Sequence, residues 1–464
     1  MKRAFPNFAP RQAASFLLVG ALTLAMALGS PLRAAEEPLA PHALLQRLCD
    51  DFGGRVTGSQ TNAGALDRLA AELRALGYAP EKQAFSMPGW ARGDDRVEML
   101  APFPRRLRVA ALGYTQPHAV FDATVISIGN GRPEDYPKDI AAARGRIGVL
   151  ASGSPLQTRE IVATSQERGL RGILFVNREG GGQLLGRSGS FVGAPLPLPV
   201  YSIAQEEGRW LERLLARGAE VRVRMETRSR CLPIETANLR LVIPGRVPGR
   251  VIVGAHFDSW DLGQGAMDNG LGIAQLYAVA RALRGVTPHH TIELIWFNGE
   301  EQGLFGSRHA ASVLGDTPVV AMLNLDMVGV PIAVNALGDA SLVPVLERWV
   351  AARPEKQKLP KGVENMNWMG SDHTPYQLVG VRCLTFNAPI PRESVRYYHD
   401  FADTIDKVSP QLVDDSAAVV IDLTRALADD ATLTPFRRSR EESVALFTTP
   451  GLDKRLKAVG LWPF

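Results

Sequence analysis

The stretch "RVIVGAHFDSWD", Arg250 to Asp261, decides the fold of this chain. Its first half is apolar on both faces of an extended strand, which is typical of a parallel sheet with helices on both sides. Its second half changes abruptly to polar residues, beginning with His256 and Asp258. Ligands of open α/β sheets bind beyond the carboxyl ends of the strands. The two side chains therefore stand where a ligand site is expected.

Three further segments have the same continuous apolar character. They are "HTIELIWF" (290–297), "VVAMLNLD" (319–326) and "VRCLTFN" (381–387). Helical patterns over 270–283 and 304–314 alternate with these strands. The alternation predicts an α/β fold, with a mixed, mostly parallel sheet that carries helices on both faces.

Acidic or histidine side chains follow each of these strands. Asp268 lies in the loop after the first strand, Glu300 and Glu301 follow the second, Asp326 ends the third, and His399 lies beyond the last. Two histidines with several carboxylates suit zinc, and cobalt or manganese are alternatives. More than four candidate ligands predict a catalytic centre with two ions.

Two aspartates lie close in sequence to the candidate histidines. Asp258 follows His256 by two residues and is placed to orient its imidazole. Asp403 follows His399 in the motif "YYHDFADT" and is a candidate for the same kind of supporting contact. Both are predicted to act around the metal ligands and not as ligands themselves.

Four further residues are candidates for substrate contacts. In "GSDHTPY", Asp372 and His373 could meet the substrate, with a helix N-cap by Ser371 or Asp372 as the competing interpretation. Tyr397 and Tyr398 flank His399, and one of them could hydrogen-bond an oxyanion. Packing explains either tyrosine equally well.

Residues 119–228 have a different character from the rest of the chain. They contain short β-rich runs, helical patterns and many glycines and prolines, but no histidine or cysteine. We predict a small α/β domain inserted into the catalytic domain, which it divides into segments 36–118 and 229–435. Residues 436–464 form a C-terminal extension.

The N-terminus predicts export. Residues 1–35 carry basic residues, then an apolar stretch from 13 to 28, then small residues, which is the order of a signal peptide. We expect a periplasmic or secreted protein without a stable membrane anchor after cleavage. The four basic residues of this leader account for the whole net charge of +4. A nearly neutral mature chain gives no reason to expect nucleic acid as a partner.

The motifs together resemble a known family. "GAHFDSWDLGQGAMDNG", "WFNGEEQGLFGS", "NLDMVG", "GSDHTPY" and "YYHDFADTIDKV" are similar to the co-catalytic zinc exopeptidases, the family of bacterial leucyl aminopeptidase and glutamate carboxypeptidase. The first motif looks most like carboxypeptidase Q, and the 119–228 insertion resembles a protease-associated domain. The likeness covers nearly all of the chain after the leader.

The resemblance implies a role for each motif residue. Asp268 would bridge two zinc ions, His256 and Asp326 would complete one site, and Glu301 and His399 would complete the other. Position 269 holds Asn where relatives often have a second Asp, a neighbour that is usually not a ligand.

The adjacent Glu300 would be the general base, taking a proton from the water between the metals and passing it to the leaving amine. The implied activity is a secreted zinc exopeptidase, an aminopeptidase or dipeptidase acting on short peptides. A carboxypeptidase is disfavoured because the motif loops show no basic cluster. The alternatives are a glutaminyl-cyclase-like acyltransferase, which typically uses one zinc, and a non-catalytic receptor-like member of the fold. The sequence is also compatible with a homodimer.

Overall fold

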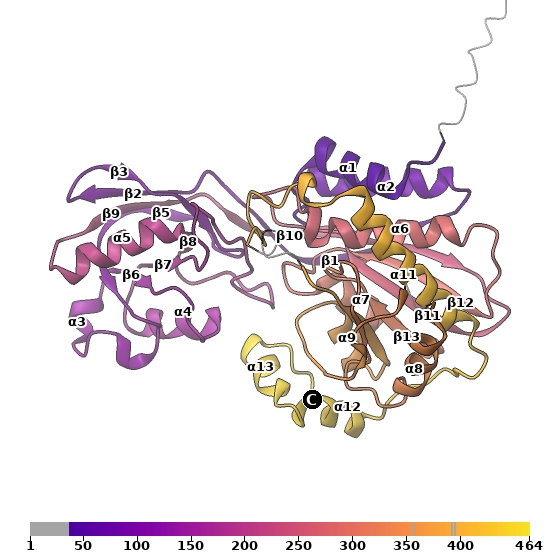
Figure 1. The fold of residues 1–464 in the computed structure, drawn as a ribbon. Coiled ribbons are helices and arrows are strands. Elements are labelled where there is room, and N and C mark those ends of the chain that lie inside the picture. Colours follow the sequence, from indigo (N-terminus) through magenta and orange to yellow (C-terminus); the bar gives the residue numbers. More distant parts are fainter. Residues whose placement is uncertain (1–36, 355–356, 391–392, 394–395) are drawn as a thin grey trace, which may run out of the picture. The chain divides into compact units, whose positions relative to one another are not determined.

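Two eight-stranded sheets organise the chain in the computed structural model (Figure 1). The structure describes residues 37–354, 357–390, 393 and 396–464, so the predicted signal peptide lies outside the described residues. Within those ranges, no helix has both the length and the apolar composition needed to cross a bilayer.

The first sheet carries the strands predicted from the apolar runs. Its order is β1-β10-β12-β11-β13-β16-β14-β15. The bounds are β1 Glu81–Ala91, β10 Arg230–Ile243, β11 Val247–His256, β12 His290–Phe297, β13 Val319–Asn324, β14 Ala333–Asn335, β15 Gly362–Glu364 and β16 Cys383–Asn387. The four central strands run parallel, and antiparallel pairs flank them. The predicted mixed, mostly parallel sheet is confirmed.

Helices cover both faces of this sheet because its central strand is apolar on both sides. Alternate residues of β11 face opposite ways: Val251 and Val253 enter one core, and Ile252 enters another. The helices on the first face are α1 Pro41–Phe52, α2 Gln60–Ala75, α6 Leu271–Ala282, α8 Val343–Ala352 and α11 Pro410–Asp429. Those on the second are α7 Phe305–Ser312 and α9 His373–Leu378.

The chain changes direction around β11. From β11 it runs through α6 to β12 on one side, and from β12 it runs through α7 to β13 on the other side. Helices α6 and α7 lie on opposite faces of the sheet. Such a reversal opens a crevice at the carboxyl ends of the strands, which is where ligands bind in this class of fold.

The second sheet has its own core and the order β3-β2-β9-β5-β6-β7-β8-β4. Its strands are β2 Arg96–Ala101, β3 Arg105–Arg106, β4 Val109–Ala111, β5 His118–Ser127, β6 Ile147–Leu150, β7 Gly172–Val176, β8 Val200–Ile203 and β9 Arg222–Thr227. Its helices are α3 Ile140–Ala143, α4 Thr158–Glu167 and α5 Gln205–Ala216. Strands β5 to β8 run parallel to one another.

This sheet also takes in β2, β3 and β4, which precede the expected boundary at residue 119. Strand β2 pairs with β9, and its alternate residues Val97 and Met99 are buried in the second core. The alternation of apolar and polar residues over 96–101 spans only six residues, which is too short to assign the strand to a sheet from the sequence. The assignment depends on its pairing with β9, which lies far away in the chain.

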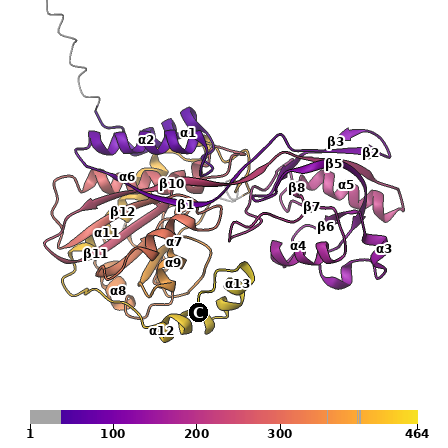
Figure 2. The ribbon, with the colours of Figure 1, turned by 180° about the vertical axis from the view of Figure 1, so that it is seen from behind.

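A long antiparallel ribbon joins the two sheets. Strands β1 and β10 pair from Glu81 opposite Arg240 to Ala91 opposite Arg230, and both views show the ribbon running from one sheet to the other (Figures 1 and 2). Trp90 near its end belongs to the second core. Trp260, from the loop after β11, is buried in that same core and meets Trp90 edge to face. The loop after β11, which carries Trp260 and lies between His256 and Asp268, is thus packed against the inserted region.

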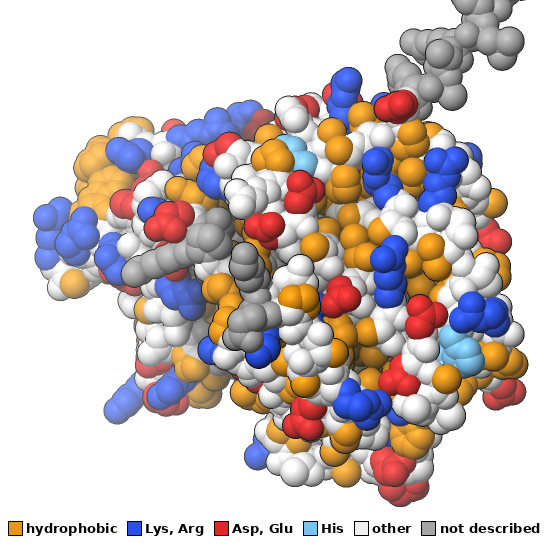
Figure 3. Space-filling view, turned by 45° about the vertical axis from the view of Figure 1, so that its right-hand side comes forward, with side chains coloured by type: hydrophobic (Ala, Val, Ile, Leu, Met, Phe, Trp, Pro, Cys, Tyr) orange, Lys and Arg blue, Asp and Glu red, His pale blue; other side chains and the backbone are white. Residues whose placement is uncertain are grey.

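The C-terminal extension forms α12 Arg440–Thr448 and α13 Leu452–Val459. Phe447 and Leu456 are buried in a small cluster with Met369, and Phe191 of the inserted region packs against it. On the face seen in Figure 3, acidic and basic side chains are interspersed, as expected for a chain that is nearly neutral without its first 35 residues.

Candidate metal centre

Five of the sequence-predicted residues meet at the carboxyl edge of the first sheet. They are His256, Asp268, Glu301, Asp326 and His399. Candidate donor atoms of His256, Asp268 and Glu301 all lie within 4.8 Å of one another. The structure brings together every residue proposed as a ligand, although they come from positions up to 143 residues apart in the chain.

Asp268 lies at the centre of this group. Its Oδ1 is 3.1 Å from Nε2 of His256, and its Oδ2 is 3.0 Å from Nε2 of His399. Asp326 Oδ1 lies 3.5 Å from His256 Nε2, and Glu301 Oε2 lies 3.0 Å from His399 Nε2. The group therefore divides into two halves that share one carboxylate.

The electrostatics show that these halves need positive charge. Burial lowers the pKa of His399, but Glu301 and Asp268 outweigh it and raise the pKa to about 10. His256 behaves in the same way, because Glu300 and Asp268 raise its pKa well above the usual value despite burial. Divalent cations bound to these side chains would balance the same carboxylates. Glu301 Oε1 is also buried without a hydrogen-bond partner. Both observations fit a site for divalent cations.

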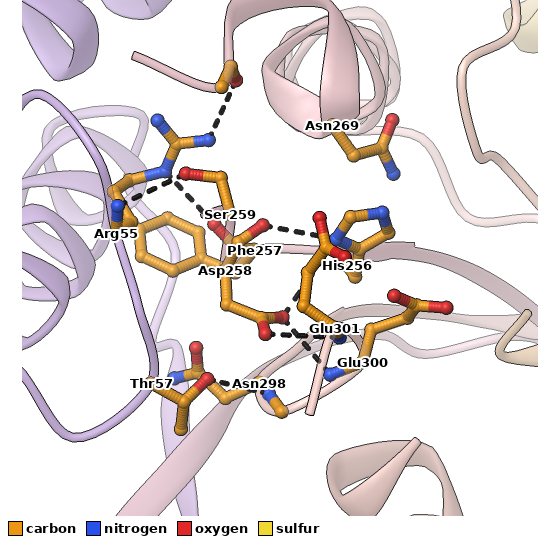
Figure 4. A network of polar contacts seen from close by, with 12 residues as sticks. Arg55, Thr57, His256, Phe257, Asp258, Ser259, Asn269, Asn298, Glu300 and Glu301 are labelled. Atoms are coloured by element: carbon orange, nitrogen blue, oxygen red, sulfur yellow. Dashed lines mark hydrogen bonds and ion pairs between the residues drawn. The ribbon is translucent and has the colours of Figure 1, made fainter. Parts of the chain in front are cut away.

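Asp258 fixes the turn that carries the two adjacent glutamates (Figure 4). Its two carboxylate oxygens accept hydrogen bonds from the backbone N–H groups of Glu300 and Glu301, at 3.1 and 3.3 Å. His256 Nδ1 lies 3.0 Å from the Asp258 carbonyl oxygen and 3.8 Å from its carboxylate. The predicted contact to the imidazole is therefore made by the backbone of Asp258, and its carboxylate holds the glutamate turn.

Asp403 supports the central carboxylate. It accepts hydrogen bonds from the backbone N–H groups of Met267, at 2.7 Å, and Asp268, at 3.1 Å. Burial raises the pKa of Asp403 to about 6, against the opposing effect of these hydrogen bonds. The neighbouring Asn269 donates from Nδ2 to the Leu325 carbonyl and accepts at Oδ1 from Met327 N–H. Asn269 thus connects the Asp268 turn to the segment that carries Asp326.

The "GSDHTPY" motif contacts the site through a residue that the sequence did not single out for that role. Ser371 donates a 2.6 Å hydrogen bond to Asp326 Oδ2. His373 is fully buried, and its Nε2 lies 2.9 Å from the Trp368 carbonyl. Asp372 makes no side-chain N-cap hydrogen bond, and burial raises its pKa to about 7.

The two tyrosines beside His399 have different surroundings. The Tyr398 ring stacks on the His399 ring with 3.6 Å between centroids. The negative charges of Asp268 and Glu301 raise the pKa of Tyr398, although 42% of the residue is exposed. The Tyr397 ring instead meets the cations of Arg396 and Lys407. Of the two, only Tyr398 lies beside the carboxylate group.

Arg55 has a role that was not predicted from the sequence. This arginine is fully buried, and its guanidinium donates to the carbonyl oxygens of Phe257, Gln264 and Gly265 at 2.7–3.0 Å (Figure 4). Thr57 nearby accepts a 2.8 Å hydrogen bond from Gly299 N–H. The segment after α1 therefore holds both the loop between His256 and Asp268 and the turn before Glu300. A single arginine without periodic context carries no sequence signal for such a role.

Comparison with known proteins agrees with the fold. Residues 238–424 match Peptidase family M28. Aminopeptidase YwaD of Bacillus subtilis (strain 168) is 24% identical over 82% of this chain and 82% of its own length. Leucine aminopeptidase 2 of Trichophyton equinum is 27% identical over 61% of this chain and 57% of its own length. Carboxypeptidase Q of Bos taurus is 24% identical over 57% of this chain and 59% of its own length.

Solved structures share the fold. The crystal structure of a Peptidase M28 precursor from Shewanella amazonensis SB2B has a TM-score of 0.73 and 22% identity, covering 87% of this chain and 96% of that chain. BSAP, a zinc aminopeptidase from Bacillus subtilis, has a TM-score of 0.69 and 23% identity, covering 86% and 96%. Fold, site and relatives define a metallo-exopeptidase. The match to Peptidase family M28 covers the segment from β10 into α11.

Proposed function

We propose that the chain is an exported, zinc-dependent exopeptidase that uses two metal ions to hydrolyse short peptides, as an aminopeptidase or dipeptidase. The family match and the aminopeptidases among its relatives support this activity. His256 and Asp326 would hold one ion, His399 and Glu301 the other, and Asp268 both.

The observation that carries this proposal is the two-sided position of Asp268. Its two oxygens face different histidines at 3.1 and 3.0 Å, so one carboxylate serves both halves of the site. A single-ion site has no use for a second histidine and glutamate on the far side of that carboxylate. Bound zinc would supply Lewis acidity to the scissile carbonyl and an activated water.

Glu300 is the residue left to move protons. Its backbone is fixed beside Glu301 by Asp258, and its carboxylate takes part in none of the contacts of His256 and His399 that join the five groups among the described residues. Burial raises the pKa of Glu300 well above its usual value, and Glu301 and Asp326 add to the shift, although His256 opposes it. In this assignment the Glu300 carboxylate accepts a proton from the attacking water and delivers it to the leaving amine. Tyr398 is the candidate donor to the oxyanion.

The test is zinc counting together with a panel of dipeptides and aminoacyl substrates, with and without a chelator. We expect two zinc ions per chain and peptide hydrolysis that is lost on chelation and restored by zinc. One zinc per chain with cyclisation of N-terminal glutamine would instead identify an acyltransferase. A metal-free protein without hydrolysis would identify a binding protein.

A further inference from the structure

The turn between β2 and β3 exposes an apolar tip at the outer edge of the second sheet. Strand β3 is the last strand of that sheet, and the turn residues Pro102, Phe103 and Pro104 are all exposed, Phe103 by 50%. In both ribbon views the β2–β3 hairpin lies at the end of the inserted region that is away from the first sheet (Figures 1 and 2). The tip therefore presents apolar side chains to the surroundings of the protein.

Neighbouring side chains hold this tip in place. The ring centroid of Phe103 lies 5.5 Å from that of Trp210 on α5, and the guanidinium of Arg105 lies 5.4 Å from the same Trp210 ring. Glu207, three residues before Trp210, accepts a 3.1 Å hydrogen bond from Arg105. Because these groups are already ordered in the free protein, little conformational entropy is lost when the tip binds a partner.

Basic side chains surround the tip. Arg105 and Arg106 follow it directly in the chain, and their side chains are 54% and 69% exposed. On α5, Arg213 and Arg217 follow Trp210 by three and seven residues, which places all three on one side of the helix. Both of these arginines are exposed. At this end of the molecule, apolar side chains are bordered by basic ones (Figure 3).

The charge of the chain is unevenly distributed. The segment between β1 and β10, residues 92–229, contains twenty basic and fifteen acidic residues. This count includes Glu207 and Asp94, the acidic partners of Arg105 and Arg106. The rest of the chain after residue 35 has the opposite imbalance, because the chain without its leader is nearly neutral. An apolar tip within an excess of positive charge matches a bilayer that contains anionic lipids.

We propose that the tip formed by Pro102, Phe103 and Pro104 docks onto a bilayer that contains anionic phospholipids. Phe103 enters the headgroup region, and Trp210 lies at the interface, where amphipathic aromatic rings are favoured. The arginines of β3 and α5 face the lipid phosphates. One apolar tip with a few cations gives weak and reversible binding, which needs no spanning helix. The metal centre belongs to the other sheet, so this inference does not depend on the proposed peptidase function.

Co-sedimentation with phospholipid vesicles tests the proposal. The protein used is residues 38–464, which form a compact unit without the leader, because an apolar leader would itself bind lipid. We expect binding to vesicles of phosphatidylglycerol and phosphatidylethanolamine in equal parts, and much weaker binding to phosphatidylcholine vesicles. Raising the salt concentration from about 0.1 M to about 1 M should weaken binding, because it screens the arginines from the lipid phosphates.

Three sets of variants assign the binding to the tip. Phe103→Ala should weaken binding by about 10-fold through loss of apolar insertion, and Arg105→Gln with Arg106→Gln should weaken it by about 10–30-fold. The vesicles should shift tryptophan emission to shorter wavelength, and Trp210→Phe should remove this shift. The matched control is Phe436→Ala, which changes an aromatic side chain that is 41% exposed and lies under Arg382, and which should bind as the wild type does.

Several results would overturn the assignment. They are equal binding to the two kinds of vesicle, wild-type binding by Phe103→Ala, or Phe103-dependent self-association without lipid, which would show that a second copy covers the tip. Complete competition by dextran sulfate, with no effect of Phe103→Ala, would identify a site for soluble polyanions instead. A wild-type Tm for each variant confirms that weaker binding does not result from unfolding.

Discussion

The carboxyl edges of the two parallel-strand arrays make an instructive comparison. At the edge of the first sheet, His256, Asp268 and Glu301 are buried together, and carboxylates outnumber imidazoles among them. At the edge of the second sheet, a cavity is lined by neutral side chains such as Asn177 and Ser202 and by charged residues of both signs, Arg178, Glu179, Arg187 and Arg396. The same topological rule places a hollow at each edge. The difference teaches that topology selects where a ligand binds, and side-chain charge selects which ligand.

Glu300→Gln should have the largest effect on activity among the substitutions at the edge of the first sheet. The amide cannot accept the proton of the attacking water, so we expect kcat to fall by about 10²–10⁴-fold. Metal content should stay at the wild-type value, because the Glu300 side chain is outside the converging group. The measurement is steady-state kinetics with zinc counting on the same preparation. Loss of metal with full activity after remetallation would assign the base elsewhere.

Glu301→Gln should weaken metal binding, whereas Glu300→Gln should impair turnover and leave metal binding unchanged. It removes the carboxylate that lies 3.0 Å from His399 Nε2, so the metal bound on that side should weaken by about 10–100-fold or more. Competition with a chelator measures this directly. Activity should recover in excess zinc, at least in part, whereas that of Glu300→Gln should not. Equal metal affinities in the two variants would contradict the division of roles.

Asp258→Asn tests whether the Asp258 carboxylate fixes the turn that carries Glu300 and Glu301. An amide offers one acceptor oxygen for the N–H groups of Glu300 and Glu301, which now use both carboxylate oxygens. We expect metal affinity or kcat to fall by about 10-fold, at the lower end of the range for supporting residues. Wild-type kinetics in this variant would show that the turn keeps its geometry without Asp258.

His373→Gln should have the smallest effect and should appear in stability, not in catalysis. Burial lowers the pKa of His373 from 6.5 to about 4, so the unfolded chain binds the proton more tightly. The stability contributed by neutral His373 is present above pH 6.5 and is lost as the pH falls towards 4. Urea denaturation at pH 7 and pH 5 measures how far the free energy of unfolding falls between the two pH values. We expect this fall to be about 2 kcal/mol smaller in the variant than in the wild type. An identical pH dependence would mean that His373 is protonated in the fold.

Much of the fold and site was predictable because the information was local. Continuous apolar runs identified β11, β12 and β13, since a strand buried on both faces needs no partner to be recognised. The candidate ligands were found because each follows such a strand, and parallel strands bring their carboxyl ends to one edge. The short β2 strand and the supporting Arg55 were missed, because their meaning depends on distant partners.

The sequence by itself determined the α/β class and the set of side chains that meet at the first edge. Only the tertiary structure decided how they divide: Asp268 between two histidines, Asp258 on the glutamate turn, Tyr398 towards the site and Tyr397 away from it. The physical reason is that neighbouring residues in the sequence are enough to identify a buried strand. The direction of a loop side chain, in contrast, depends on packing against segments far away in the chain.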